Sequence, residues 1–91
     1  MAVTIRIPTQ LRQLTGGTGE IEVDADTVGA ALGGLEGAYQ GFGERIFDGE
    51  GQLRRFVNVF LADEDIRFLQ GLDTPVAEGQ VISIVPAVAG G

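Results

Sequence analysis

The sequence predicts an α+β fold, in which one main helix covers one face of a four- to five-stranded mixed sheet. Three observations predict it: strand-like alternation of apolar and polar residues near both ends of the chain, one amphipathic helical segment between them, and glycine or proline at the junctions. The chain has 91 residues, of which 44% are hydrophobic. That composition supports one small core and leaves no room for a second.

The first forty residues predict a β-hairpin followed by the helix. Residues 3–7 and 20–23 alternate between apolar and polar side chains, and the connection at 9–18 is longer than a tight turn. The helix is predicted over 27–39, because a threonine at its start is a suitable N-cap and the apolar residues after it recur at helical spacing. Its glycines weaken it, so packing must hold it, and the pair at 33–34 is expected to allow a close approach.

The second half of the chain predicts three more strands. The expected elements are a loop at 41–51 with one short turn at 44–47, a strand at 56–61, an acidic turn at 63–65, a short edge strand at 66–68, a loop at 71–79 and a last strand at 81–85 that Pro86 ends. In this order the first and last strands pair in parallel at the centre of the sheet, which is a β-grasp arrangement. The inward positions give the expected core: Val3, Ile5, Ile7, Ile21, Val23, Val28, Leu32, Leu35, Val57, Val59, Ile82 and Ile84.

The composition excludes several kinds of chemistry. The chain has no cysteine and no histidine, which removes disulfides, thiolate catalysis and the commonest general base and metal ligand. A net charge of −7, from 13 acids against six bases, makes nucleic acid and anionic membrane poor partners and favours a partner with a basic surface. No segment resembles a signal peptide or a membrane span, so the expected location is the cytoplasm.

Two short motifs are weak candidates for ligand sites. The acidic run at 63–65 lacks the spaced donors and the glycine of a calcium loop, and it is typical of a solvated turn. The glycine-rich segment at 16–19 lacks the lysine of a phosphate loop and belongs to the hairpin connection. No metal site is therefore expected.

The end of the chain carries the strongest functional signal. Because Pro86 cannot extend a hydrogen-bonded strand, residues 1–86 are expected to form the domain and residues 87–91 to leave it as a tail. Gly90 and Gly91 have no side chain, so this tip can pass through a channel too narrow for other residues.

A β-grasp order that ends in Gly-Gly resembles the ThiS/MoaD family of ubiquitin-like sulfur carriers. The resemblance spans nearly the whole chain, and the segments 55–60, 63–68 and 85–91 are most similar to the CysO type, which serves cysteine biosynthesis. It implies that the chain is not an enzyme but a substrate. An E1-like adenylating enzyme, which supplies ATP and magnesium, would activate the carboxylate of Gly91, and a sulfur donor would convert it to a thiocarboxylate. No cofactor is expected on the chain itself.

The resemblance also implies which residues meet the partner. The tail residues that would lie in the partner's channel are Gly90, Ala89 and Val88. Phe60 and Val85, expected as neighbours on adjacent strands of the outer sheet face, are similar in position to the hydrophobic recognition patch of ubiquitin-like proteins. Arg54 and Arg55 border this strand and would pair with acidic groups of a partner.

The sulfur acceptor stays open. The resemblance implies a pyridoxal-phosphate cysteine synthase, where the thiocarboxylate attacks an aminoacrylate and an acyl shift leaves cysteine amide-linked to Gly91, with a metalloprotease for release. Alternative acceptors are a thiazole-synthase-like enzyme, an enzyme of thiosugar-type sulfur insertion, and the large subunit of molybdopterin synthase. In the last case this chain would be the small subunit of molybdopterin synthase. A different class is a ubiquitin-like modifier joined through Gly91 to target lysines. A third is a permanent structural subunit anchored by its tail.

Overall fold

The computed structural model describes residues 1–55 and 57–86. Its elements in chain order, with η for a 3-10 helix, are β1 (Ala2–Arg6), η1 (Thr9–Thr15), β2 (Glu20–Asp24), α1 (Val28–Ala38), α2 (Phe42–Ile46), β3 (Val57–Leu61), β4 (Glu64–Asp65), η2 (Ile66–Phe68), η3 (Gly71–Asp73) and β5 (Val81–Pro86). None of the helices in these two ranges has the length and apolar character that crossing a bilayer requires.

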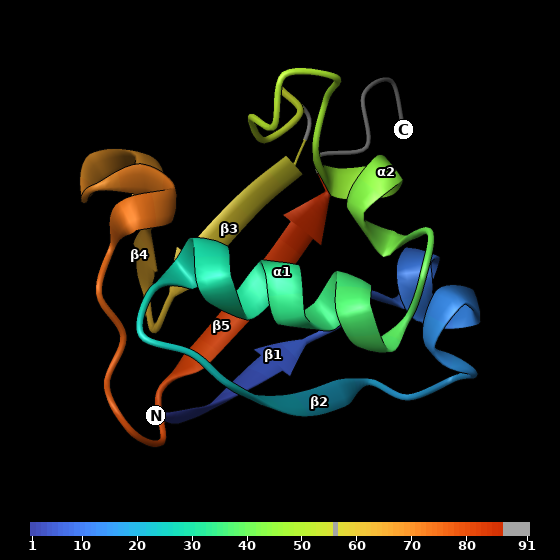
Figure 1. The fold of residues 1–91 in the computed structure, drawn as a ribbon, viewed down its shortest axis with the longest axis horizontal. Helices are drawn as coiled ribbons and strands as arrows, with labels where there is room; N and C mark the ends of the chain where they lie inside the picture. The colour runs from blue at the N-terminus through green and yellow to red at the C-terminus, as the bar shows by residue number, and fades with distance from the viewer. Residues whose placement is uncertain (56, 87–91) are drawn as a thin grey trace.

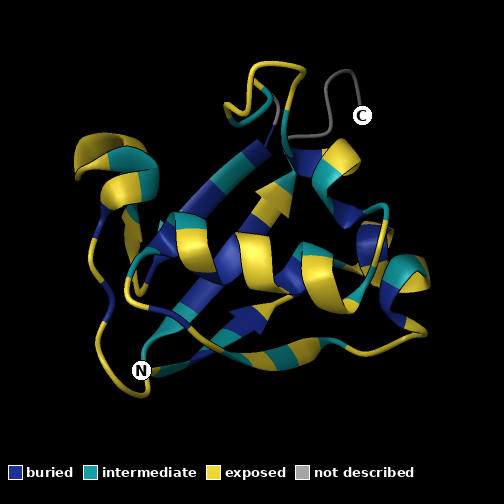
Figure 2. Cartoon of the chain, in the orientation of Figure 1, coloured by how far each residue is buried: buried dark blue, intermediate teal, exposed yellow. Residues whose placement is uncertain are grey.

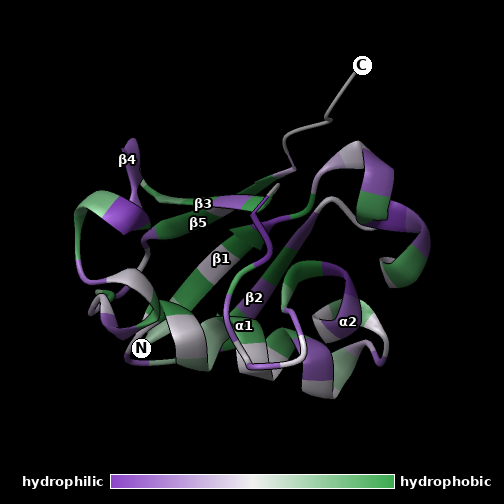
Figure 3. Ribbon diagram, turned by 90° about the horizontal axis from the view of Figure 1, so that it is seen from above, coloured by the Kyte–Doolittle hydropathy of each residue, from purple (hydrophilic) through white to green (hydrophobic). Residues whose placement is uncertain are grey.

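The five strands form one mixed sheet in the order β2-β1-β5-β3-β4 (Figure 1). β1 and β5 run parallel at its centre, with Ile5 opposite Ile82, and the other neighbouring strands in the described ranges are antiparallel. Seen from above in Figure 3, the sheet forms one layer and α1 lies beneath it as a second. The predicted β-grasp arrangement, with the first and last strands paired in parallel, is confirmed.

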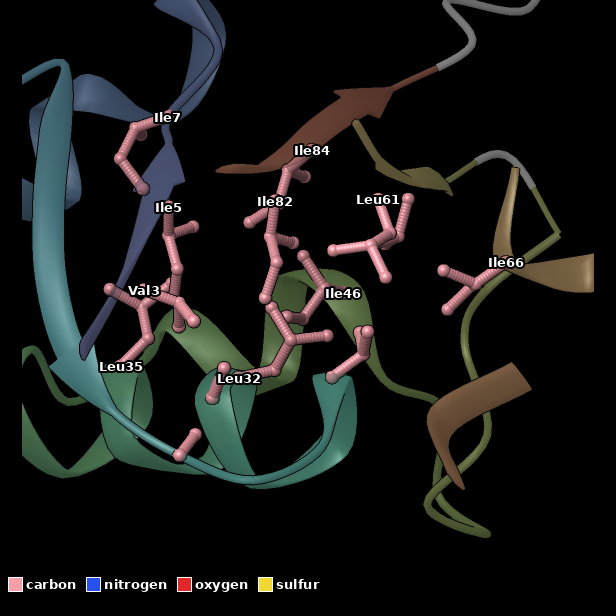
Figure 4. Packing of buried hydrophobic residues seen from close by; sticks show 14 of the residues in the cluster. Val3, Ile5, Ile7, Leu32, Leu35, Ile46, Leu61, Ile66, Ile82 and Ile84 are labelled. Atoms are coloured by element: carbon pink, nitrogen blue, oxygen red, sulfur yellow. The ribbon is translucent and has the colours of Figure 1, made fainter. Parts of the chain in front are cut away.

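One face of the sheet packs against α1 to form the core (Figure 4). Along the central strands the inward residues are buried and alternate with half-buried or exposed ones, which gives the banded strands in Figure 2. Every residue of the predicted core is buried except Ile21 and Val23, which are half-buried against the rest. Both lie on β2, an edge strand with a neighbour on one side only, so water reaches their side chains.

α1 matches its predicted range. Thr27 is the N-cap, and its hydroxyl oxygen accepts a hydrogen bond from the N–H of Ala30 at 3.1 Å. Tyr39 is the C-cap. The first and last residues of the predicted range, 27 and 39, are therefore the N-cap and the C-cap of the observed helix. The stripe that α1 buries against the sheet consists of Val28, Ala31, Leu32 and Leu35.

The close approach predicted at two glycines of α1 is wrong. No atom lies within 4 Å of a Cβ built on Gly33, and a Cβ on Gly34 would make only ordinary contact with Val23, at 3.8 Å. The close approach is one turn earlier, where a Cβ on Gly29 would lie 3.0 Å from the carbonyl oxygen of Leu72. The glycine that the fold needs is therefore the one facing η3.

The segment after β3 also differs from the prediction. The expected acidic turn at 63–65 supplies the two-residue strand β4, and the expected edge strand at 66–68 is instead the 3-10 helix η2. The turn comes earlier because Ala62 adopts a left-handed φ of 56° directly after β3. The carboxylate of Asp65 then accepts a hydrogen bond from the N–H of Arg67 at 2.9 Å and so begins η2.

The predicted loop at 41–51 contains a short helix, α2, whose Phe42 and Ile46 are fully buried. The turn predicted at 44–47 overlaps this helix but misses its first residues. The carboxylate of Glu36 on α1 accepts hydrogen bonds from two backbone N–H groups at the start of α2, at 3.3 and 3.1 Å, and so fixes the two helices to each other. The long connection of the first hairpin likewise contains η1 rather than a plain loop.

Candidate functional site

The predicted reactive end follows the last described residue, Pro86. The predicted site residues that lie outside the described ranges are Gly91, Gly90, Ala89 and Val88, and Phe56, the predicted first residue of the third strand, is also outside them. β5 includes Pro86 as its last residue, opposite Val57, whereas the sequence predicted that the strand ends at Val85. A proline is tolerated there because it is the final position of the strand.

The outer face of the sheet, opposite the core, carries Val85 and Phe60. Val85 is 44% exposed and lies opposite Asn58 in the register, while Phe60 is half-buried and lies opposite Ser83. The two residues are therefore on adjacent strands and on the same face, as diagonal rather than directly opposed neighbours. Diagonal neighbours in an antiparallel pair are about 7–8 Å apart, a distance that large side chains bridge. Val85 is the more accessible member of the pair.

Arg67 extends this face and was not among the predicted site residues. Its guanidinium donates one hydrogen bond from Nη1 to Oδ1 of Asn58 at 2.9 Å, and two from Nη2, to the carbonyl oxygens of Val57 at 2.8 Å and Arg54 at 3.4 Å. Asn58 is the register partner of Val85. The side chain of Arg67 therefore fixes η2 against the strand that flanks the end of β5.

The two arginines predicted to border the patch take different places. Arg54 is half-buried, and its Nε donates a hydrogen bond to the carbonyl oxygen of Glu44 on α2 at 3.0 Å. Arg55 is exposed. Arg54 thus faces α2 and has a structural contact, whereas Arg55 is the one of the two that is open to a partner.

A shallow groove of about 310 Å³ lies beside Val85, between the ends of β1 and β5. Its lining residues are Arg6, Ile7, Pro8, Gln10, Ser83, Ile84, Val85 and Pro86. At its rim, Nε of Arg6 lies 3.2 Å from Oε2 of Glu20 in an exposed ion pair, which contributes little to stability. A larger groove of about 560 Å³ lies between α2 and the loop that follows it. The smaller groove adjoins the point where the described chain ends.

The two short motifs that the sequence offered as weak ligand sites take ordinary places in the fold. Within 1–55 and 57–86, no three carboxylates gather closely enough to hold a metal ion. The acidic run at 63–65 is divided between a turn and β4, and Gly16 of the glycine-rich segment is the left-handed C-cap of η1, with a φ of 67°. Both motifs therefore lie in turns and short elements of the fold, as the sequence predicted for the glycine-rich segment.

The comparison with protein families identifies the family of the chain. The ThiS family model matches residues 5–91. The chain belongs to the ThiS family. The match begins at Ile5, within β1, and continues through β5 to the residues beyond Pro86, so the Gly-Gly end is part of what matches.

Several proteins are similar to the chain over all or nearly all of its length. It is 48% identical to the sulfur carrier protein CysO of Mycobacterium tuberculosis, with 100% of both chains covered. The crystal structure of the BexX/CysO complex of Amycolatopsis orientalis has a chain that superposes with a TM-score of 0.91 at 43% identity, covering 98% of this chain and 99% of that one. The small archaeal modifier protein SAMP1 of Haloferax volcanii superposes with a TM-score of 0.85 at 29% identity, with 100% of both chains covered.

Proposed function

We propose that the chain is a sulfur carrier protein, in which the C-terminal carboxylate of Gly91 is adenylated and then converted to a thiocarboxylate. The observation that carries the proposal is the match to the ThiS family over 5–91, together with 48% identity to a sulfur carrier over the full chain. The chain is a carrier and not an enzyme. Its substrate role explains a sequence with no cysteine and no histidine, since the carrier contributes only a carboxylate.

The chemistry needs an activating step because a carboxylate is a poor electrophile. A carboxylate oxygen of Gly91 attacks the α-phosphorus of ATP, pyrophosphate leaves, and an acyl adenylate forms. A sulfide equivalent from the sulfur donor then attacks the carbonyl carbon and AMP leaves, which gives the thiocarboxylate. The E1-like partner supplies ATP, magnesium and the catalytic groups, and the carrier supplies no cofactor.

The outer sheet face serves as the docking surface for this partner. Val85 and Phe60 offer apolar area close to the end of β5, and Arg55 offers an exposed charge. A partner that covers this face receives the residues after Pro86 at a defined place. Gly90, Ala89 and Val88 would then enter a narrow channel that leads to the adenylating centre.

The similarity to CysO favours cysteine biosynthesis as the destination of the sulfur. The acceptor would be a pyridoxal-phosphate cysteine synthase, and a metalloprotease would release the product from Gly91. The experiment that tests the carrier function is the intact mass of the protein isolated from its own cells. Replacement of one oxygen by sulfur predicts a species heavier by about 16 Da, which a thiol-directed alkylating reagent shifts further. Absence of this species under every growth condition with active sulfur assimilation would contradict the proposal.

A second candidate function is conjugation to proteins, which the similarity to a small archaeal modifier protein favours. The chemistry is the same as far as the acyl adenylate, and then a target lysine amine would replace the sulfur donor. Isopeptide-linked conjugates of Gly91 in cell extracts distinguish this function. If the chain is only a sulfur carrier, cell extracts contain the free thiocarboxylate form, heavier by the mass difference given above, and no conjugates.

A further inference from the structure

Phe68 is an aromatic side chain that the fold leaves almost entirely in water. It is 83% exposed, and the next residue, Leu69, is 42% exposed. Phe68 is the last residue of η2, and Figure 2 shows the turn beyond β4 as largely exposed. We call these two residues the η2 patch. Single exposed apolar residues are ordinary, but here an exposed aromatic adjoins an exposed leucine, and aromatic residues including phenylalanine are enriched in the cores of interfaces.

The backbone that carries the η2 patch is held in place from three sides. Ile66, at the start of η2, is completely buried in the core. The carboxylate of Asp65 accepts a hydrogen bond from the N–H of Arg67, and the guanidinium of Arg67 is bonded to Asn58 and Val57 on β3. The patch is therefore presented on a fixed scaffold. A contact made by a fixed element loses less conformational entropy on binding than one made by a mobile loop.

The segment that carries the η2 patch has a net negative charge. The segment from 63 to 73 has four carboxylates and one base, and that base, Arg67, is turned toward β3. The carboxylates are Asp63, Glu64, Asp65 and Asp73. A surface that complements the patch would therefore have an apolar socket with arginine or lysine at its rim.

The η2 patch is within reach of a partner that covers Val85. Arg67 beside the patch bonds to Asn58, and Asn58 is the register partner of Val85. Neighbouring strands are about 4.8 Å apart, and two strand spacings separate β5 from β4, the edge strand after which η2 begins (Figure 1). A standard interface buries about 800 Å² on each partner, which is a surface roughly 30 Å across. An interface of that extent centred on Val85 would reach the β4 edge, where η2 begins.

We propose that the η2 patch is a second docking element, which inserts into an apolar, basic-rimmed socket on the enzyme that adenylates Gly91. This inference rests on the proposed function. An acyl adenylate is lost to water if the carrier leaves early, so the carrier must stay bound through both adenylation and sulfur transfer. An anchored aromatic side chain slows dissociation, which is the property that this enzyme needs.

The test is calorimetric binding of single variants to the adenylating enzyme. Phe68→Ser is expected to raise the Kd at least about tenfold, as for a central interface aromatic, with Phe68→Leu between it and the wild type. Gln70→Ala, on the same segment and also exposed, is the matched control and is expected to change the Kd by less than about twofold. Since Phe68 makes little contact within the chain, the melting curves of all variants are expected to coincide. The double variant Asp63→Asn, Glu64→Gln is expected to weaken binding and reduce its salt dependence.

Three results would overturn the proposal. The first is equal binding by Phe68→Ser and Gln70→Ala. The second is an effect of Phe68→Ser only on self-association of the free chain in sedimentation, because the patch would then take a second copy. The third is an effect only on binding to the sulfur acceptor. The proposed function is tested separately, by adenylation of the wild-type chain before any variant is compared. If the enzyme does not adenylate the wild-type chain, the proposed function is wrong, and this inference is wrong with it.

Discussion

Arg67 shows how much one side chain contributes to the shape of the candidate site. β4 pairs with β3 only at Phe60 and Leu61, so the first carbonyl groups of β3 have no strand neighbour on that side. The guanidinium of Arg67 supplies the missing donors, to the carbonyl oxygen of Val57 and the side chain of Asn58. Sequence reasoning missed this role because it depends on η2, which was predicted as a strand.

Replacement of Arg67 by methionine keeps an unbranched apolar stem and removes the guanidinium with its donors. Hydrogen bonds from a charged group contribute more than neutral ones, so Arg67→Met is expected to lower the free energy of unfolding by about 1–2 kcal/mol. Arg55→Met is the control, since Arg55 is exposed, and its expected change is within about 0.5 kcal/mol. Urea denaturation of both variants measures the difference. Equal stabilities would show that the bonds of Arg67 contribute nothing to the fold.

A substitution at Val85 tests the proposed docking surface without disrupting the core. Because its side chain is partly exposed, Val85→Asp is expected to leave the chain folded, with a melting temperature lower by several degrees at most, and to raise the Kd for the adenylating enzyme at least about tenfold. Gln13→Glu adds the same charge at an exposed position on η1 and controls for net charge. If calorimetry gives the two variants the same affinity, Val85 is not part of the docking surface.

At the scale of elements, the long periodic segments could be predicted and the short ones could not. The strands around Ile5 and Val59 and the helix α1 have enough residues for alternation or helical spacing to appear in the sequence. α2 and η2 have five and three residues, too few for a period, and tertiary contacts decide their conformation. Burial of Phe42 and Ile66 is such a contact, and neither residue was in the predicted core.

The glycines of α1 test the contact between α1 and η3. Gly33→Ala is expected to stabilise the fold by about 0.5–1 kcal/mol, because the position is open and alanine favours the helix. Gly29→Ala is expected to destabilise it by about 1–3 kcal/mol, since the new Cβ would press on the backbone of Leu72. Paired denaturation curves compare the two changes in one helix. Stabilisation by both would show that the contact at Gly29 is not tight.

At the scale of the whole molecule, the two faces of the sheet differ: one forms the core, and the other is the proposed docking surface. One face of the sheet packs against α1, and the other face carries Val85 and the side chains that flank it. The family and the sheet topology could be predicted, because the strand order and the Gly-Gly end are both written in the sequence. The layout of the docking face could be predicted only in part. Val85 and Phe60 follow from strand alternation, whereas the contribution of η2 depends on a turn that begins at Ala62.

The central claim is that Gly91 is the reactive end, and ATP–pyrophosphate exchange by the adenylating enzyme tests it most directly. The wild-type chain is compared with one that lacks Gly91 and one that has an additional alanine after it, with melting curves to check that all three fold alike. The enzyme must hold the carboxylate at a fixed depth beside the α-phosphate, and a misplacement of about 1 Å costs roughly 100-fold in rate. Both altered chains are therefore expected to lose exchange. Exchange at the wild-type rate with the extended chain would show that Gly91 is not the reactive end and would contradict the carrier function.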